Sequence, residues 1–173
     1  MAETFTAYFS AVSFAAGKAM AAILNSHATE VLKARRIGLL NAQTASVTGV
    51  LCQMELRAYG ATATYTGSTA AAITSHDSTN TAPSSYTAGY AGTPGGSTPT
   101  VLRRIFWSSD EAAISAATSD ELETYVPLNI IFDAGYGDSN VQPLTRRQNE
   151  MVCLYNTTGA AGLLDTWIEF TKE

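Results

Sequence analysis

The chain has 173 residues, of which 46% are hydrophobic and 14% are charged, and its formal net charge is −5. This length predicts one domain with one core, and the apolar content excludes a disordered chain, which combines few apolar residues with high net charge. The ten Lys and Arg residues are scattered, which argues against binding to nucleic acid phosphates. No apolar run reaches the roughly 20 residues of a membrane helix.

The N-terminus and the two cysteines predict the compartment. Met1–Phe5 lacks the basic and apolar regions of a secretory signal, so we expect synthesis in a cytoplasm without export by the general pathway. Cys52 and Cys153 lie far apart and form no CxxC pair. They are therefore expected to be buried free thiols, not a disulfide framework.

The first half of the chain predicts a series of short strands. Phe5–Phe14 is rich in aromatic residues, and Lys18–Leu24 is rich in Ala and fits a helical turn or a strand. Thr29–Leu40 and Ala61–Thr66 are further strand candidates. In Val50–Arg57, apolar and polar residues alternate, which is the pattern of a half-buried strand.

The segment Ser78–Thr100 differs from the rest of the first hundred residues. It has 23 residues and no charge, and consists mainly of Ser, Thr, Gly, Pro and Ala. A loop of this length without structure of its own is uncommon in a compact domain. We expect an extended loop or an arm that orders against a neighbour, anchored by Tyr86 and Tyr90.

The remaining chain predicts further strands at Val101–Ser108, Asp120–Asp133, Met151–Tyr155 and Leu163–Thr171, with one helical turn within Ser109–Thr118. In Asp120–Asp133 the alternation places Ile130 and Phe132 on the core face, and Pro127 indicates an edge strand that is bulged or broken there. Many short strands separated by polar turns predict an all-β fold. We expect an antiparallel β-sandwich of jelly-roll type over residues 1–173.

Catalytic and metal-binding patterns are weak. His27 and His76 are the two histidines, and neither lies in a zinc or triad motif. Both cysteines fall on apolar strand faces, which favours packing over nucleophilic chemistry. The sequence therefore predicts no enzyme, no cofactor and no metal.

Carboxylates leave two alternatives open. Asp133 and Asp138 could hold calcium, or could cap turns by bonding to the local backbone. Asp110–Glu111 and Asp120–Glu123 could flank a sugar for acid–base work, or could be solvated strand faces. The aromatic residues Trp107, Trp167, Tyr136 and Tyr155 could likewise form a sugar platform, although core packing is the commoner role of such residues on strands.

Basic residues occur in three pairs, Arg35-Arg36, Arg103-Arg104 and Arg146-Arg147. Adjacent residues on a strand face opposite ways, so each pair is expected to place one Arg toward solvent and one toward the interior or a neighbouring subunit. The inward member would pair with an acid of its own chain or form a salt bridge between subunits.

Several segments resemble virion structural proteins of tailed bacteriophages. They are Leu102–Glu111, Asp133–Asp138, Gln142–Glu150 and Trp167–Thr171. The resemblance covers roughly the C-terminal half together with Arg36–Gly49, and it carries no catalytic residue. It implies a capsid-associated part, such as a head decoration or cement protein, or a tail or fibre component.

These observations predict a non-enzymatic virion protein that binds the capsid surface and self-associates, with a trimer favoured. Its partners would be the major capsid protein or other virion proteins. The alternative is a tail or fibre module that binds host-surface glycans. The residues expected to contact subunits or the shell are Tyr86, Tyr90, Arg36, Arg104 and Arg147.

Overall fold

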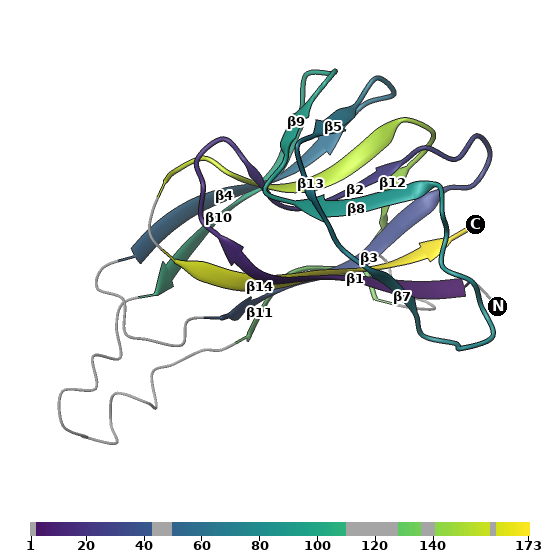
Figure 1. Cartoon of the computed structure of the whole chain (residues 1–173), viewed down its shortest axis with the longest axis horizontal. Helices are drawn as coiled ribbons and strands as arrows, with labels where there is room; N and C mark the ends of the chain where they lie inside the picture. The colour runs from purple at the N-terminus through teal and green to yellow at the C-terminus, as the bar shows by residue number, and fades with distance from the viewer. Residues whose placement is uncertain (1–2, 43–49, 110–127, 136–140, 160–161) are drawn as a thin grey trace.

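The computed structural model describes residues 3–42, 50–109, 128–135, 141–159 and 162–173. Two antiparallel sheets pack face to face, and no helix occurs among these residues (Figure 1). The predicted all-β sandwich is therefore confirmed. The helical turn expected within Ser109–Thr118 and the first part of the strand expected at Asp120–Asp133 lie outside the described residues.

The first sheet, sheet A, has the strand order β11-β3-β14-β1-β7, with β12 pairing beside β11 on β3. Its strands are β1 (Glu3–Ser13), β3 (Leu32–Asn41), β7 (Ile73–Ser75), β11 (Leu128–Asp133), β12 (Leu144–Arg146) and β14 (Leu163–Lys172).

The second sheet, sheet B, has the order β10-β4-β13-β2-β8-β6. Its strands are β2 (Ala19–Asn25), β4 (Val50–Tyr59), β6 (Thr69–Ala70), β8 (Tyr86–Tyr90), β10 (Thr100–Ser109) and β13 (Glu150–Asn156). Lys18–Leu24, which fitted a helical turn or a strand, is thus largely β2. A separate ribbon pairs β5 (Thr64–Thr66) with β9 (Thr93–Gly95).

The pairing of the eight principal strands is nested. In sheet A, β1 pairs with β14 and β3 with β11, and in sheet B, β2 pairs with β13 and β4 with β10. Among these eight strands, the first in the chain therefore pairs with the last, the second with the last but one, and so on toward the middle of the chain. In a jelly roll, a long folded ribbon wraps into two sheets, and this finer assignment stays a prediction.

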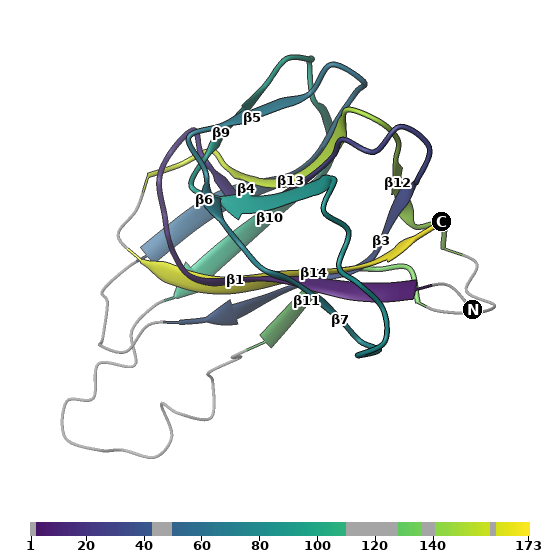
Figure 2. The same ribbon diagram turned by 45° about the vertical axis from the view of Figure 1, so that its right-hand side comes forward.

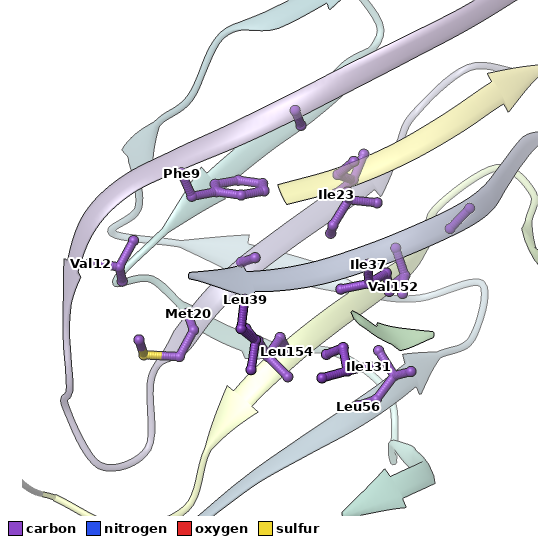
Figure 3. Close-up of a cluster of buried hydrophobic side chains, with 14 of the residues drawn as sticks. Phe9, Val12, Met20, Ile23, Ile37, Leu39, Leu56, Ile131, Val152 and Leu154 are labelled. Carbon is purple, nitrogen blue, oxygen red and sulfur yellow. The ribbon is translucent and has the colours of Figure 1, made fainter. Parts of the chain in front are cut away.

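The core fills the space between the sheets. Figure 3 shows Phe9 and Ile37 of sheet A near Ile23 and Leu154 of sheet B, all completely buried. Alternation along β1 and β14 supplies the inward residues of sheet A because successive side chains of a strand point to opposite faces. The clearest predicted alternation, in β4, supplies the buried Cys52, Met54 and Leu56.

A second, smaller apolar cluster lies on the other face of sheet B. Ala19, Ala22, Met151 and Cys153 are buried there, with Tyr59 and Ala63, and Tyr65 of β5 packs against them. Figures 1 and 2 show the β5–β9 ribbon beyond sheet B, on the side away from sheet A. The chain therefore covers the β2 and β13 part of this face with its own ribbon.

The segment Ser78–Thr100 is not a free arm throughout. It contributes β8 to sheet B and β9 to the ribbon. Tyr86 is 5% exposed and its ring lies 5.8 Å from that of Phe170, centroid to centroid. Tyr90 meets Phe9 edge to face at 6.5 Å. The two aromatic residues thus anchor the segment to the chain's own core. The sequence did not predict this, because β8 and β9 are short and contain no charged residues that would show an alternation of apolar and polar positions.

The core face predicted for β11 is wrong at Ile130, whereas Phe132 is half-buried and packs against the main core as predicted. The register between β11 and β3 shifts between Ile130 and Phe132, so Ile131 enters the core at 4% exposure while Ile130 is 40% exposed. A bulge adds one residue to a strand and reverses the faces beyond it. The sequence indicated an irregular edge strand, but it did not locate the bulge.

Candidate assembly surfaces

The outer side of β10 carries an exposed apolar ridge. Phe106 is 63% exposed, and Val101 and Leu102 are also exposed. β10 is the terminal strand of sheet B, with β4 as its one partner among the described strands. The register shift between Val101 and Arg103 makes Leu102 the extra residue of a bulge. We call Leu102, Arg104 and Phe106 the β10 ridge.

A charge cluster stands beside the ridge on β4. The carboxylate of Glu55 is almost fully buried and lies 2.6 Å from an Arg57 nitrogen and 3.1 Å from Nε of Arg104. Burial alone would raise the pKa of Glu55, but the hydrogen bonds and charges of Arg57 and Arg104 hold it below its ordinary value. Arg57 also stacks over Tyr155 at 3.6 Å from the ring centroid. Glu55 therefore stays ionised and fixes both guanidinium groups.

The outer face of sheet A carries a row of residues that crosses four strands. Tyr8 of β1 is opposite Trp167 of β14, Trp167 is opposite Gly38 of β3, and Gly38 is opposite Ile130 of β11. Tyr8 is 45% exposed and Trp167 is half-buried. We call these residues the sheet A row.

Both aromatic residues of the row are held in position. The indole of Trp167 covers Gly38, where a Cβ would come within 2.1 Å of Cζ2. The hydroxyl of Tyr8 donates to a carboxylate oxygen of Asp165, and the other oxygen accepts the backbone N–H of Ala11 at 2.6 Å. Ala11 has a φ of 48° at the bulge of β1, so Asp165 joins this bulge to the Tyr8 ring.

The charges around the row are paired within the chain. Arg36 contacts Asp133 at 3.1 Å and Glu169 at 3.8 Å, and Lys33 and Arg35 both contact Glu173. The pKa of Asp133 lies below its ordinary value, chiefly because its carboxylate accepts the Gly135 N–H. Asp133 thus closes a turn and holds an arginine, which is the turn-capping alternative left open by the sequence; Asp138 lies outside the described residues.

The five expected contact residues do not form one site. Tyr86 and Tyr90 belong to the core, as described above. Arg36 lies on the outer face of sheet A, and Arg104, which is 66% exposed, belongs to the β10 ridge. Arg147 is exposed in the turn between β12 and β13, where its N–H donates to Glu150. Arg36 and Arg104 therefore remain available as parts of two separate surfaces.

The arginine pairs follow the predicted alternation only in part. Arg104 points outward to Glu55, whereas Arg103 donates to the backbone oxygen of Ile131 and so ties the edges of the two sheets together. Arg35 and Arg36 instead both meet acidic residues of their own chain. The register between β3 and β14 skips Arg35, so a bulge breaks the alternation there.

The two cysteines are buried, and the two histidines form hydrogen bonds within the chain. Cys52 and Cys153 are buried and free, as the sequence predicted, and burial raises the pKa of Cys52 to about 11. His27 accepts the backbone N–H of Glu30 at 2.8 Å, and His76 bonds to the hydroxyl of Thr6. Among the residues described, no group of three or more His, Cys, Asp or Glu could hold a metal ion.

One shallow pocket of about 220 Å³ adjoins His27. Lys172, Glu30 and the segment 81–85 complete its walls. The pocket is lined by residues that belong neither to the β10 ridge nor to the sheet A row.

The proposed aromatic platform is not assembled. Trp107 is buried between the sheets, Tyr155 lies under Arg57, and Trp167 lies on the outer face of sheet A. Tyr136 lies outside the described residues. Sequence reasoning missed Tyr8, Phe106 and Ile130 as surface residues, because an apolar residue in a strand pattern reads as core and only the register shows its face.

Comparison with known proteins gives no assignment. No family model, no curated protein and no solved structure matches the chain. Within the described part of the chain, no helix has the length and apolar character needed to cross a membrane.

Proposed function

We propose that this chain is a non-enzymatic structural component of a virus particle, which binds the capsid surface and self-associates to decorate or cement it. The resemblance of its C-terminal half to tailed-phage virion proteins suggests the setting. The observation that carries the proposal is the β10 ridge, where apolar side chains stand exposed on the terminal strand of a sheet.

The ridge fits a protein partner. Contiguous exposed apolar residues on an otherwise well-packed domain mark interaction sites, and a terminal strand presents unpaired backbone groups that a partner strand can bond. Phe106 would be the central anchor, since large aromatic residues dominate interface energetics. Arg104, fixed by Glu55 at 3.1 Å, would orient the contact.

The experiment is to count copies of the chain in purified particles by quantitative mass spectrometry. The proposal predicts many copies per particle, and loss of most of them with Phe106→Ser. A matched control is Val141→Ser, since Val141 is also an exposed apolar residue but lies away from the ridge. Particles that lack the chain would contradict the proposal. A few copies per particle, with glycan binding, would favour the tail or fibre alternative.

A further inference from the structure

The two outer faces of the sandwich are treated differently by the chain. The β5–β9 ribbon covers the part of the outer face of sheet B formed by β2 and β13, where Met151 and Cys153 are completely buried, and leaves the β10 end of that face exposed. No described strand lies beyond sheet A on the opposite side (Figures 1 and 2). The aromatic residues of sheet A are therefore left uncovered by the described part of the chain.

We propose that the outer face of sheet A, centred on the sheet A row of Tyr8, Trp167, Gly38 and Ile130, binds a second copy of this chain. The proposal rests on the proposed function, because it assigns a surface to the self-association in it. It assigns particle binding and self-association to different surfaces, the β10 ridge and the sheet A row.

The row has the composition and rigidity of an interface centre. Aromatic residues are enriched at the buried centres of interfaces. Tyr8 is fixed by Asp165 and Trp167 by its seat on Gly38, so little side-chain entropy remains to be lost on association. Because Gly38 has no side chain, the indole lies close to the sheet and the face stays flat enough to meet an identical face.

The charges favour a second copy over a charged partner. The face carries three basic residues and four carboxylates, so its net charge is about −1 of the chain's −5. The basic residues are Lys33, Arg35 and Arg36, and the carboxylates are those of Asp133, Asp165, Glu169 and Glu173. Identical surfaces necessarily bring like charges together, and this cost is reduced here because three of the four carboxylates contact a basic residue and Asp165 accepts hydrogen bonds from Tyr8 and Ala11. A nucleic acid or an anionic membrane would require an excess of basic residues instead.

The polar groups beside the aromatic residues do not suit a sugar. The Tyr8 hydroxyl is committed to Asp165, and both oxygens of Asp165 are occupied. Asp133 is committed to Arg36 and to the Gly135 N–H. A glycan would have to share these acceptors with the chain's own donors to bond its hydroxyls, whereas a protein face can pack on the row without using them.

The test compares Ile130→Glu with Phe106→Glu. Both replace an exposed apolar residue near the end of a sheet, so neither opens the core. Sedimentation velocity over about 1 to 100 µM, a range that spans affinities of weak to moderate complexes, would report the mass relative to the 18.2 kDa chain. We expect an oligomer for the wild type and for Phe106→Glu, and at least a tenfold weaker association for Ile130→Glu.

Trp167 provides a second readout that does not depend on mass. The chain has two tryptophans, and Trp107 is buried between the sheets. In a Trp107→Phe variant, the emission of Trp167 should shift to shorter wavelength as concentration rises, and Ile130→Glu should abolish that shift.

A wild-type chain that stays monomeric throughout this range would overturn the proposal, as would an Ile130→Glu variant that still associates. If the chain is present in particles but Ile130→Glu has no effect on association, the inference fails and the proposed function stands. If copies associate through the row but particles lack the chain, the proposed function fails and the inference stands.

Discussion

The indole of Trp167 lies directly over Gly38 across the junction of β14 and β3. A Cβ at position 38 would approach Cζ2 to 2.1 Å and Cη2 to 2.4 Å. Glycine in a strand interior weakens the strand because it has no side chain to pack. Here the neighbouring aromatic residue fills that place, which explains why a strand with buried Ile37 and Leu39 tolerates Gly38 between them.

Gly38→Ala should displace the Trp167 ring and lower the free energy of unfolding by about 1–3 kcal/mol, the cost of overpacking. Urea denaturation followed by tryptophan fluorescence measures the loss. Gly60→Ala is the matched control, because the nearest atom to its added Cβ is 4.0 Å away. Equal stability of the two variants would show that the indole does not rest on Gly38.

Asp165→Ala should release the bulge of β1. The carboxylate accepts both the Tyr8 hydroxyl and the Ala11 N–H, so its loss should cost about 1–3 kcal/mol of unfolding free energy. Tyr8→Phe removes only the first contact and should cost less. Thermal unfolding of the two variants compares them, and a larger loss for Tyr8→Phe would mean that Asp165 does not hold the bulge.

Asp165→Ala should also change the pKa of Tyr8. Partial burial, followed by the hydrogen bond and charge of Asp165, raises the pKa of Tyr8 to about 12. In Asp165→Ala the pKa should fall toward the ordinary 10.0 while remaining above it, since the burial persists. Nuclear magnetic resonance of labelled tyrosine side chains follows this group separately.

Glu55→Gln should destabilise the chain more than Arg104→Ala. Glu55 is the buried member of the cluster and removing its charge leaves Arg57 without its acid, a loss of about 1.5–3 kcal/mol for hydrogen bonds to a charged group. Arg104 is mostly exposed, and such surface pairs contribute about 0–1 kcal/mol. Chemical denaturation of both single variants and the double variant measures the coupling between Glu55 and Arg104. Equal losses of unfolding free energy in the two single variants would mean that the exposed Glu55–Arg104 pair, and not the Glu55–Arg57 pair, stabilises the fold.

The free energy of unfolding should decrease in alkaline solution. Burial raises the pKa values of Tyr65 and Tyr86 above the ordinary 10.0, and that of Cys52 from 9.0 to about 11. Above pH 9 the unfolded chain therefore loses protons that the folded chain retains, so stability is full below that pH and is lost as pH rises through the folded values.

Denaturation midpoints between pH 7 and 11 measure this dependence. Tyr65→Phe removes one of the titrating groups and should flatten the decrease. A midpoint that is constant up to pH 11 would mean that these groups are solvated in the folded chain.

The sequence predicted the strands whose apolar residues alternate over a long span. β4 and β14 are examples, because one face of each packs in the core and the other meets solvent or neighbours. It did not predict β7, β8 or β9, which are short and lie in segments of Ser, Thr, Ala and Gly without alternation. β7 and β8 obtain their hydrogen bonds from the longer strands β1 and β2, whereas β9 pairs with the equally short β5.

The candidate surfaces were harder to predict than the fold. The exposure of Ile130 follows from one bulge in β11, and that of Phe106 from its register opposite Gln53. A register shift of one residue exchanges the two faces of a strand, and nothing in the local sequence fixes such a shift. Arg36 and Arg104 lie at the surface, and their expected contacts with subunits or the shell stay a prediction. Tyr86 and Tyr90 pack on the chain's own core, because their strand was not recognised from the sequence.

The most direct measurement is hydroxyl-radical footprinting of the chain bound to particles, compared with the free oligomer. We expect Phe106 and Leu102 to become protected only on the particle, and Tyr8 and Trp167 to be protected in both samples. Unchanged oxidation of Phe106 on binding, or a chain that does not bind particles at all, would contradict this expectation.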